Sequence, residues 1–202
     1  MPELILHGAP RSNYVRTARI ALAEKGVEYT HDPALPQTPE QLERHPWGKL
    51  PALTHGDVRL YETLAVTRYI DEAFDGPALQ PADPAGRALM DQWISVYNAY
   101  VDPPVLRKIV IQRLLRDPSD EALIAAGIPD AEKAIAVLDA GLADSPHLAG
   151  GDATLADFFH MPALDYLSMT PEGEKILATA GNVTTWLARM RERDAVKAVL
   201  EG

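Results

Sequence analysis

The chain reads His45-Pro46-Trp47-Gly48-Lys49-Leu50-Pro51-Ala52-Leu53 at the point that is most informative about its fold, and Tyr61-Glu62-Thr63 follows shortly afterwards. Proline cannot donate a backbone hydrogen bond to a sheet. Pro51 at the start of an apolar strand therefore predicts an edge, a bulge or an unusual bond geometry. Glu62-Thr63 opens a helix, whose free N–H groups favour anions. This stretch is a candidate platform for a small anionic ligand.

The segments around this stretch predict an α/β domain. Leu4-Ile5-Leu6 forms a strand that ends at the Gly8-Ala9-Pro10 loop. Ser12 or Asn13 then caps a helix that ends at Lys25-Gly26. The remaining predicted elements are a strand over 27–30, a short helix over 38–44, hairpin strands over 50–54 and 58–60, and a helix through Phe74. The order is βαβ followed by ββα, with a right-handed parallel crossover in the first part.

The second half of the chain reads as helical throughout. Proline-rich segments at 75–77 and 81–84 form a linker between the halves. The predicted helices cover 85–116 with a kink at Asp102-Pro103-Pro104, 129–142, 154–168, and two or three shorter pieces over 171–200. Thr154 and Asp157 are spaced as a capping box. The predicted domains are therefore 1–77 and an all-helical 85–202.

Composition limits the possible functions. There is no cysteine, which excludes disulfides and a protein thiol nucleophile, and the six histidines show no metal-binding spacing. The formal net charge of -10 argues against nucleic acid and anionic membranes as partners. No apolar run approaches the roughly 18 residues that a membrane span requires. We expect a cytoplasmic protein without a metal site.

Several residues have both a functional and a purely structural explanation when each is considered alone. Ser12 lies where ligands bind in open α/β sheets, but a serine there more commonly caps the helix. Lys49 reads as a surface lysine, and Pro51 as trans on frequency alone. Three aromatic residues recur at helical spacing and are more often core than pocket: Trp93, Tyr97 and Tyr100. No single signal identifies a function.

Taken together, these features resemble the cytosolic glutathione transferases of the serine-type, bacterial-like kind. The segment from Ser12 to Arg19 is similar to the catalytic-serine segment of that family, and Trp47 to Leu53 is similar to its cis-proline motif. Tyr61-Glu62-Thr63 resembles the γ-glutamyl-binding motif, and Thr154 to Asp157 the capping box of the second domain. The resemblance implies a thioredoxin-like N-terminal domain that binds glutathione and an all-α C-terminal domain.

The resemblance also implies a role for each matching residue. Ser12 donates its hydroxyl to the glutathione sulfur. Leu50, before a cis Pro51, offers its backbone to the cysteinyl part, and Lys49 reaches the glycyl carboxylate. Glu62 and Thr63 hold the γ-glutamyl ammonium and carboxylate. The candidate electrophile pocket is Tyr14, Trp93, Tyr97 and Tyr100, with Tyr14 also the alternative to Ser12 as the thiol contact.

Two residues depart from the family pattern: Thr63 stands where serine is usual, and Arg11 precedes Ser12. The implied activity is conjugation of glutathione, a co-substrate, to a small electrophile in a homodimeric detoxification enzyme that needs no other cofactor. Three alternatives use the same thiolate differently: ether cleavage, peroxide reduction and isomerisation. A non-catalytic ligand-binding module of the same fold is a further alternative.

Overall fold

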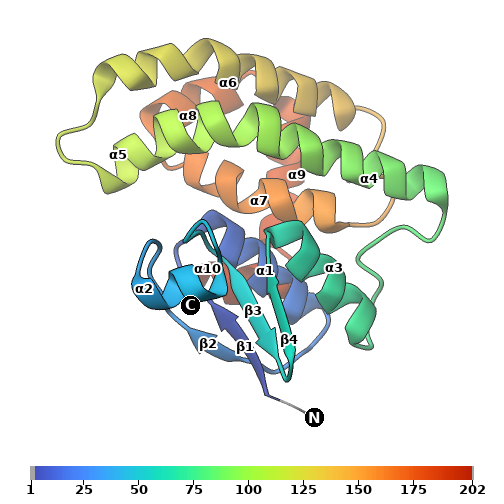
Figure 1. Cartoon of the computed structure of the whole chain (residues 1–202). Coiled ribbons are helices and arrows are strands. Elements are labelled where there is room, and N and C mark those ends of the chain that lie inside the picture. The colour runs from blue at the N-terminus through green and yellow to red at the C-terminus, as the bar shows by residue number, and fades with distance from the viewer. Residues whose placement is uncertain (1–2, 202) are drawn as a thin grey trace. The chain divides into compact units, whose positions relative to one another are not determined.

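The computed structural model describes residues 3–201 and consists of two compact units (Figure 1). The first unit contains the chain up to Gln80 together with the segment from Arg193 onward, and the second unit spans Pro81–Glu192. The unit boundary falls inside the predicted linker. The sequence prediction assigned 85–202 to the helical domain, whereas the structure puts the segment from Arg193 onward with the first unit.

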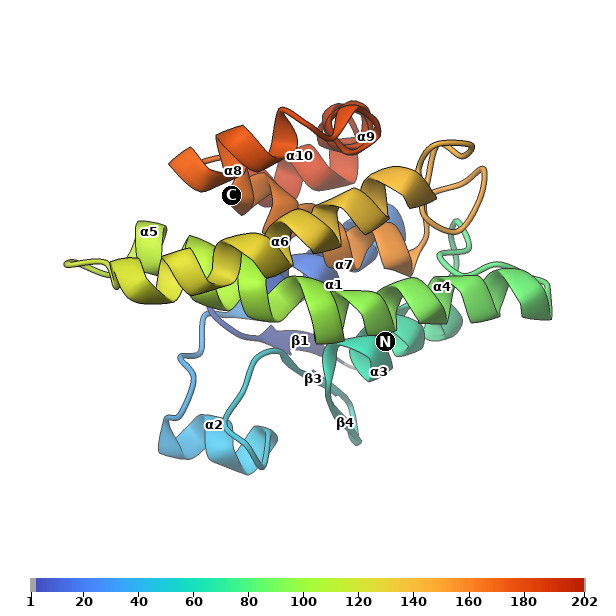
Figure 2. The same ribbon diagram turned by 90° about the horizontal axis from the view of Figure 1, so that it is seen from above.

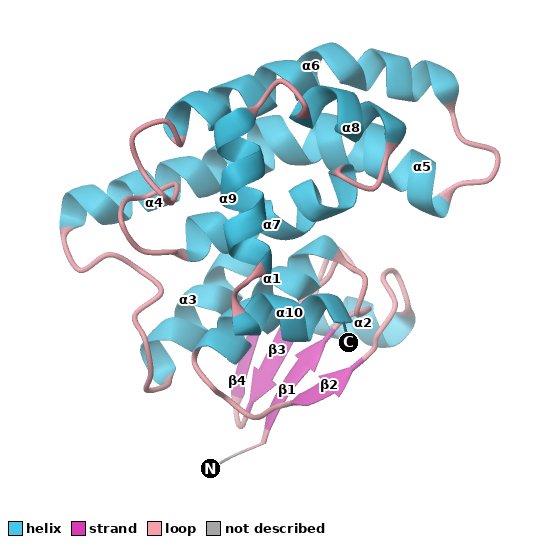
Figure 3. Cartoon of the chain, turned by 180° about the vertical axis from the view of Figure 1, so that it is seen from behind, coloured by secondary structure: helices cyan, strands magenta, loops and turns pink. Residues whose placement is uncertain are grey.

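A four-stranded mixed sheet forms the centre of the first unit. Its strands are β1 (Leu4–His7), β2 (Thr30–Asp32), β3 (Ala52–His55) and β4 (Val58–Tyr61). They lie in the order β2-β1-β3-β4, with β1 parallel to β2 and antiparallel to β3, and β3 antiparallel to β4 (Figure 3, magenta). The helices of this unit are α1 (Asn13–Glu24), α2 (Pro39–Arg44), α3 (Thr63–Ala73) and α10 (Asp194–Glu201). This is the predicted βαβ-ββα arrangement.

Alternation along the strands builds the core of this unit. Leu6 and Leu53 are fully buried on one face of the sheet, and α1 and α3 pack against each other beside them. Neighbouring residues on a strand point to the opposite face, which carries His7 and Thr54. Leu6 and Leu53 thus share one face of the sheet, and His7 and Thr54 share the other.

The last helix of the chain belongs to this unit because it packs against α1. Arg193 binds Glu24 through two hydrogen bonds, at 2.7 Å from Nε and 2.8 Å from Nη2. Three residues of α10 are buried: Ala195, Val196 and Val199. The C-terminal segment thereby covers a helix that lies close to the other end of the sequence.

The predicted second strand was placed too early in the sequence. β2 begins at Thr30 rather than at residue 27. The positive φ of Gly26 (65°) ends α1, and the N–H of Val27 still bonds the carbonyl of Leu22 at 3.0 Å. The residues after Gly26 are thus used to leave the helix before pairing with β1 begins.

The second unit contains only helices (Figure 2). They are α4 (Pro84–Val96), a π-helix η1 (Tyr97–Val110), α5 (Ile111–Leu115), α6 (Glu121–Gly141), α7 (Leu155–Leu167), α8 (Pro171–Leu177) and α9 (Gly181–Arg191). None of the helices within residues 3–201 is long and apolar enough to cross a bilayer.

The predicted proline kink is instead a widened helix. Pro103 and Pro104 lie inside η1, whose hydrogen bonds run between residues five apart. Asp102 and Arg107, which are five residues apart, form an ion pair with 2.9 Å between Oδ2 and Nε. A π-helix brings such a pair to one side, because its turn is wider than that of an α-helix.

The helix predicted from residue 129 begins earlier, at Glu121. Asp120 caps it by accepting a hydrogen bond from the N–H of Leu123 at 2.9 Å. Arg113 also binds the first residue of the helix, Glu121. The cap and the ion pair start the helix ahead of Pro129, which lies within it.

The central helix of the second unit, α7, is buried along almost its whole length. Its start is the predicted capping box, because Thr154 accepts a bond from the helix and Asp157 accepts one from the N–H of Thr154 at 2.9 Å. Phe158 and Phe159 of this helix are buried in the core. This prediction is confirmed.

Candidate functional site

The register of the sheet brings the predicted site segments to one edge. His7, at the end of β1, pairs with Ala52, which begins β3. Ala52 also pairs with Tyr61, at the end of β4. The loop before Ser12, the Leu50–Pro51 bond and the Glu62–Thr63 step therefore all leave the sheet at the same edge.

Gly8 permits the close approach of these segments. A Cβ atom at Gly8 would lie 2.4 Å from Cγ2 of Val15 and 3.5 Å from Cβ of Leu50. The first distance is far below van der Waals contact, so a larger residue would separate the loop from α1. The glycine thus keeps the loop that leads to Ser12 beside Leu50.

Ser12 is the N-cap residue of α1, but its side chain makes no capping hydrogen bond. Its backbone N–H donates to the carbonyl of Ala9 at 2.9 Å, and its carbonyl accepts from the N–H of Arg16 at 2.9 Å. The backbone therefore holds Ser12 at the helix start without using the hydroxyl. The partial positive charge of the helix end acts at the same place.

Tyr14 lies in the first turn of α1 and is half-buried. An inward-pointing Tyr14 hydroxyl required a helix that starts late, yet α1 starts at Asn13. The helix start thus puts Ser12 at the cap position and Tyr14 within the first turn.

The Leu50–Pro51 peptide bond is cis, as the resemblance implied. The preceding residue, Lys49, is exposed, and its carbonyl accepts a hydrogen bond from Nε2 of Gln41 at 2.7 Å. Gln41 is fully buried, and its Oε1 has no hydrogen-bond partner. A residue of α2 therefore fixes the backbone that precedes Leu50.

Glu62 and Thr63 begin α3 with an unusual backbone. Glu62 has φ +67°, a left-handed conformation that non-glycine residues adopt infrequently, and its side chain makes no capping bond. The carboxylate is 65% exposed, whereas Thr63 is buried. The helix start thus places an exposed carboxylate next to a threonine and the first N–H groups of α3.

The sequence reasoning missed His45, which is 2% exposed and ends α2. Its ring lies against the ring of Tyr61 with 4.8 Å between centroids, and its Nε2 lies 3.8 Å from Oε1 of Glu62. Burial lowers the pKa of His45, although the Glu62 carboxylate acts in the opposite direction. Its only sequence signal is its position at the start of the proline motif.

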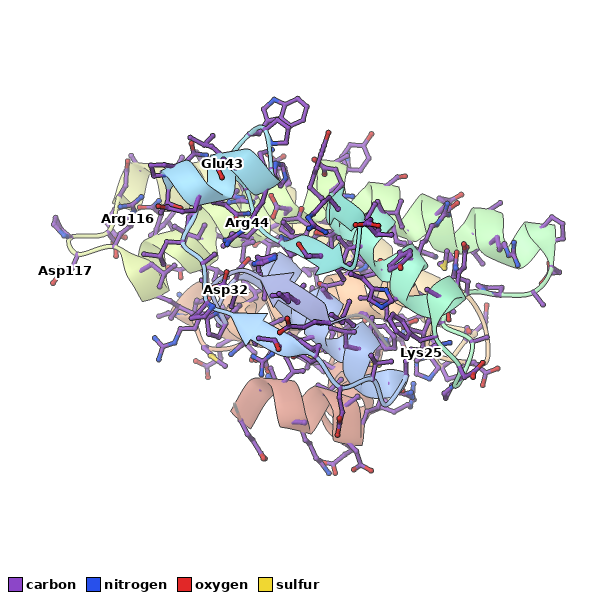
Figure 4. The ribbon with its side chains drawn as sticks, turned by 60° about the horizontal axis from the view of Figure 1, so that its bottom comes forward. Lys25, Asp32, Glu43, Arg44, Arg116 and Asp117 are labelled. Atoms are coloured by element: carbon purple, nitrogen blue, oxygen red, sulfur yellow. The ribbon has the colours of Figure 1, made fainter. Side chains whose placement is uncertain are left out.

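A polar cluster connects α2 to the sheet. Nη1 of Arg44 lies 3.1 Å from Oδ2 of Asp32, which lies 2.8 Å from Nδ1 of His7 (Figure 4 labels Arg44 and Asp32). The hydrogen bond from His7 lowers the pKa of Asp32. Nε2 of His7 contacts the Thr54 hydroxyl at 3.1 Å. The short helix that carries Gln41 and His45 is thus attached to β2.

Two of the predicted pocket residues lie in the core of the helical unit. Tyr97 is fully buried and Trp93 is 7% exposed. Both contact His160 in edge-to-face geometry, with centroids 5.2 Å and 6.4 Å away. The alternative that the sequence left open, an aromatic core stripe, describes these two residues. Tyr100 differs because it is 66% exposed.

No group of three metal-binding side chains occurs in the part of the chain that the structure describes. The site edge itself is a polar surface built from several elements. Its parts are a hydroxyl at a helix start, an exposed peptide edge before Pro51, and a carboxylate–hydroxyl pair at a second helix start.

Comparison with known proteins identifies the family. Residues 6–78 match the family model described as glutathione S-transferase, N-terminal domain, and residues 101–194 match the corresponding C-terminal domain. A glutathione S-transferase from Hyoscyamus muticus is 30% identical over 206 residues, covering 97% of each protein.

Solved structures agree with this similarity in sequence. The crystal structure of poplar glutathione transferase F1 has a TM-score of 0.90 at 28% identity, covering 100% of this chain and 98% of that one. Glutathione S-transferase I from mais, in complex with an atrazine glutathione conjugate, has a TM-score of 0.88 at 28% identity, covering 100% and 97%. The thioredoxin-like domain, the helical domain and the sequence similarity along the whole length show that this chain belongs to the glutathione transferase family.

Proposed function

We propose that this transferase is of the serine type, and that Ser12 stabilises the thiolate of glutathione for attack on an electrophilic carbon. The observation that carries the proposal is the Ser12 hydroxyl, which stands at the start of α1 and makes no capping bond there. A hydroxyl donor and a helix N-terminus both favour a thiolate over a thiol. Ser12 would thus activate the nucleophile without itself forming a covalent bond.

The rest of the tripeptide would extend along the site edge. The backbone of Leu50 would pair with the cysteinyl part, as strand addition to a free edge does. Glu62 would bind the γ-glutamyl ammonium, and Thr63 with the first N–H groups of α3 would bind the α-carboxylate. Lys49, exposed and cationic, would bind the glycyl carboxylate. The anionic Glu62 and the cationic Lys49 thus match the ammonium at the γ-glutamyl end of glutathione and the carboxylate at its glycyl end.

Conjugation is favoured over the other reactions of the same thiolate, because the mais relative was solved with a glutathione conjugate of atrazine. For the electrophile we propose a small organic molecule. Of the predicted pocket aromatics, only the exposed Tyr100 stays a candidate contact in the helical unit; Trp93 and Tyr97 are not carried forward. Glutathione would be the co-substrate, with no further cofactor.

We also infer a cytoplasmic homodimer, as family membership suggests. The rings of Trp47 and Tyr61 support an apolar contact surface on the first unit, since their centroids lie 6.1 Å apart and they are 61% and 37% exposed. Soluble monomers rarely leave such side chains together at the surface without a partner. Sedimentation of wild type beside a Trp47→Ala variant tests whether that surface contributes to dimerisation.

The Ser12→Ala variant tests the central assignment. Removing the hydroxyl should raise the pKa of the bound thiol by about 1 to 2 units, which corresponds to a roughly 10- to 100-fold loss of thiolate well below that pKa. The measurement is ultraviolet titration of enzyme-bound glutathione, together with the conjugation rate against pH. Ser95→Ala is the matched control, since the Ser95 hydroxyl donates to the Asp91 carbonyl on an exposed face of α4. An unchanged thiol titration in Ser12→Ala would refute the role.

A further inference from the structure

The environment of His45 suggests a role beyond those proposed above. Its backbone N–H donates to the Gln41 carbonyl at 2.8 Å, and its carbonyl accepts from the N–H of Gly48 at 2.7 Å. Its ring packs against the rings of Tyr61 and Trp47, at centroid distances of 4.8 Å and 6.1 Å. A ring held by backbone bonds and by two aromatic neighbours has a fixed direction.

The hydrogen bond at the other ring nitrogen decides the tautomer of His45. The N–H of Trp47 donates to Nδ1 at 3.3 Å, so Nδ1 offers a lone pair. In a neutral imidazole the proton then resides on Nε2. Nε2 is the atom that faces Oε1 of Glu62, at 3.8 Å. His45 therefore directs an N–H group toward the carboxylate.

The Glu62 side chain needs such a partner to be held in place. Its backbone has φ +67°, its carboxylate does not cap α3, and 65% of the side chain is exposed. An exposed glutamate loses much rotamer entropy when it is ordered. The 3.8 Å separation is longer than a direct hydrogen bond, and a small rotation of this exposed side chain closes it.

We propose that His45 is a positioning residue for glutathione binding. As a neutral Nε2–H donor, His45 orients the Glu62 carboxylate toward the γ-glutamyl ammonium. This inference rests on the proposed function, because it assumes that Glu62 binds that ammonium. A neutral donor orients the carboxylate while leaving its whole charge for the ligand. The arrangement thus contributes to glutathione affinity rather than to thiolate formation.

The same geometry predicts a pH effect on glutathione binding. A protonated His45 would pair with Glu62 and compete with the ligand ammonium. The groups that face the imidazole are Glu62 at the start of α3, Lys49 in the loop and the Tyr61 phenol on β4. Burial is the largest influence on the His45 pKa and lowers it. Affinity should therefore hold through the ordinary histidine pKa of about 6.5 and fall only at more acidic pH, where the imidazole gains its proton.

The test compares two His45 variants. His45→Phe keeps an aromatic ring beside Tyr61 but loses the donor, and should raise the KM for glutathione about tenfold with less than a twofold change in kcat. His45→Asn keeps a polar donor that does not titrate, and should restore KM to within about threefold at neutral pH. In both variants the rise of KM toward acid pH should disappear.

His55→Phe is the matched control, since His55 bonds the Tyr69 hydroxyl at 2.7 Å instead of facing Glu62. It should keep the wild-type KM and its pH profile. A variant that merely loosened the fold would lower the active fraction without removing the pH dependence. A His45→Phe enzyme with a wild-type KM at every pH would overturn the inference.

Glu62→Gln separates this inference from the proposed function. If Glu62→Gln leaves KM unchanged, Glu62 does not bind the ammonium and both proposals fail at this residue. If Glu62→Gln raises KM while His45→Phe does not, only the role of His45 fails. If both proposed roles are correct, His45→Phe should raise the KM little further in the Glu62→Gln background, because the two residues act through one contact.

Discussion

At the scale of single residues, the burial of His160 makes the stability of the fold depend on pH. It is fully buried on α7, where Nδ1 lies 2.9 Å from the carbonyl of Ala156 and Nε2 has no hydrogen-bond partner. Burial lowers its pKa from the ordinary 6.5 to about 4. The folded state keeps the imidazole neutral in a pH range where the unfolded chain protonates it.

The sign of the stability effect follows from those two pKa values. Between pH 6.5 and about 4 the unfolded state binds more protons than the folded state. As the pH is lowered through this range, the free energy of unfolding should therefore fall by about 1.4 kcal/mol per pH unit. The total reaches about 3 kcal/mol. His160→Leu, which suits the surrounding apolar side chains, should remove most of this loss. Urea unfolding at pH 7 and pH 4.5, followed by tryptophan fluorescence, measures it.

A histidine variant in the other unit provides the comparison. His31→Asn should leave the pH dependence of the helical unit as in wild type. If the wild-type protein and His160→Leu lose equal stability between the two pH values, His160 is not the group responsible.

The residues that sequence reasoning identified belong to local motifs, and those it missed do not. Ser12, Pro51 and Glu62 each stand beside a strand or helix end that the sequence marks. His45 and His160 depend on burial by segments distant in the chain, which no local pattern encodes. Tyr97 shows the converse, because helical spacing alone does not distinguish a buried core face from a pocket wall.

At the scale of elements, the start of α7 depends on one buried carboxylate. Oδ1 of Asp157 accepts hydrogen bonds from Nε1 of Trp186 at 2.8 Å and from the N–H of Leu148 at 3.1 Å. Oδ2 accepts from the N–H of Thr154 at 2.9 Å. Burial opposes ionisation, but the bonds from His147, Thr154 and Trp186 hold the pKa of Asp157 below its usual value. The carboxylate therefore joins a loop, a helix start and α9.

Asp157→Asn should destabilise the helical unit strongly. The amide nitrogen would direct two donors at groups that are themselves donors, so at least one buried N–H would lose its acceptor. We expect a loss of about 3 kcal/mol or more, against about 1 kcal/mol for Thr154→Ala, which removes only the capping hydroxyl. Urea unfolding measures both, with the exposed Asp152→Asn as control. Equal effects of Asp157→Asn and Asp152→Asn would contradict the account.

Element boundaries were predictable where a cap or glycine is local and not where contacts decide. The end of α1 follows from Gly26 and the start of α7 from Thr154, whereas Ser12 precedes α1 without a capping bond from its side chain. The start of α6 was missed because Pro129 reads as a helix start, while the observed start uses Asp120 and the Arg113 ion pair. The π-helix was missed because two prolines are more often a kink.

At the scale of the whole molecule, the chain does not divide into two consecutive domains. Its last helix belongs to the unit that contains its first residues, so the sequence of that unit is complete only after the whole helical unit. Sequence reasoning placed this helix with its neighbours in the chain, since amphipathicity shows which face is buried but not which partner covers it.

Truncation after Glu192 should therefore weaken the first unit and spare the second. The deletion exposes the surface of α1 that Val196 and Val199 cover and breaks the ion pair between Arg193 and Glu24. Burial of two valines is worth about 1.5 to 3 kcal/mol each, a large share of the roughly 5 to 15 kcal/mol that stabilises a domain. Hydrogen exchange should then speed up in α1 and β1 and keep its wild-type rate in α6 and α7. The isolated peptide 193–202, added in excess, should restore protection to α1. Equal loss of protection in both units would show instead that α10 supports the molecule as one cooperative body.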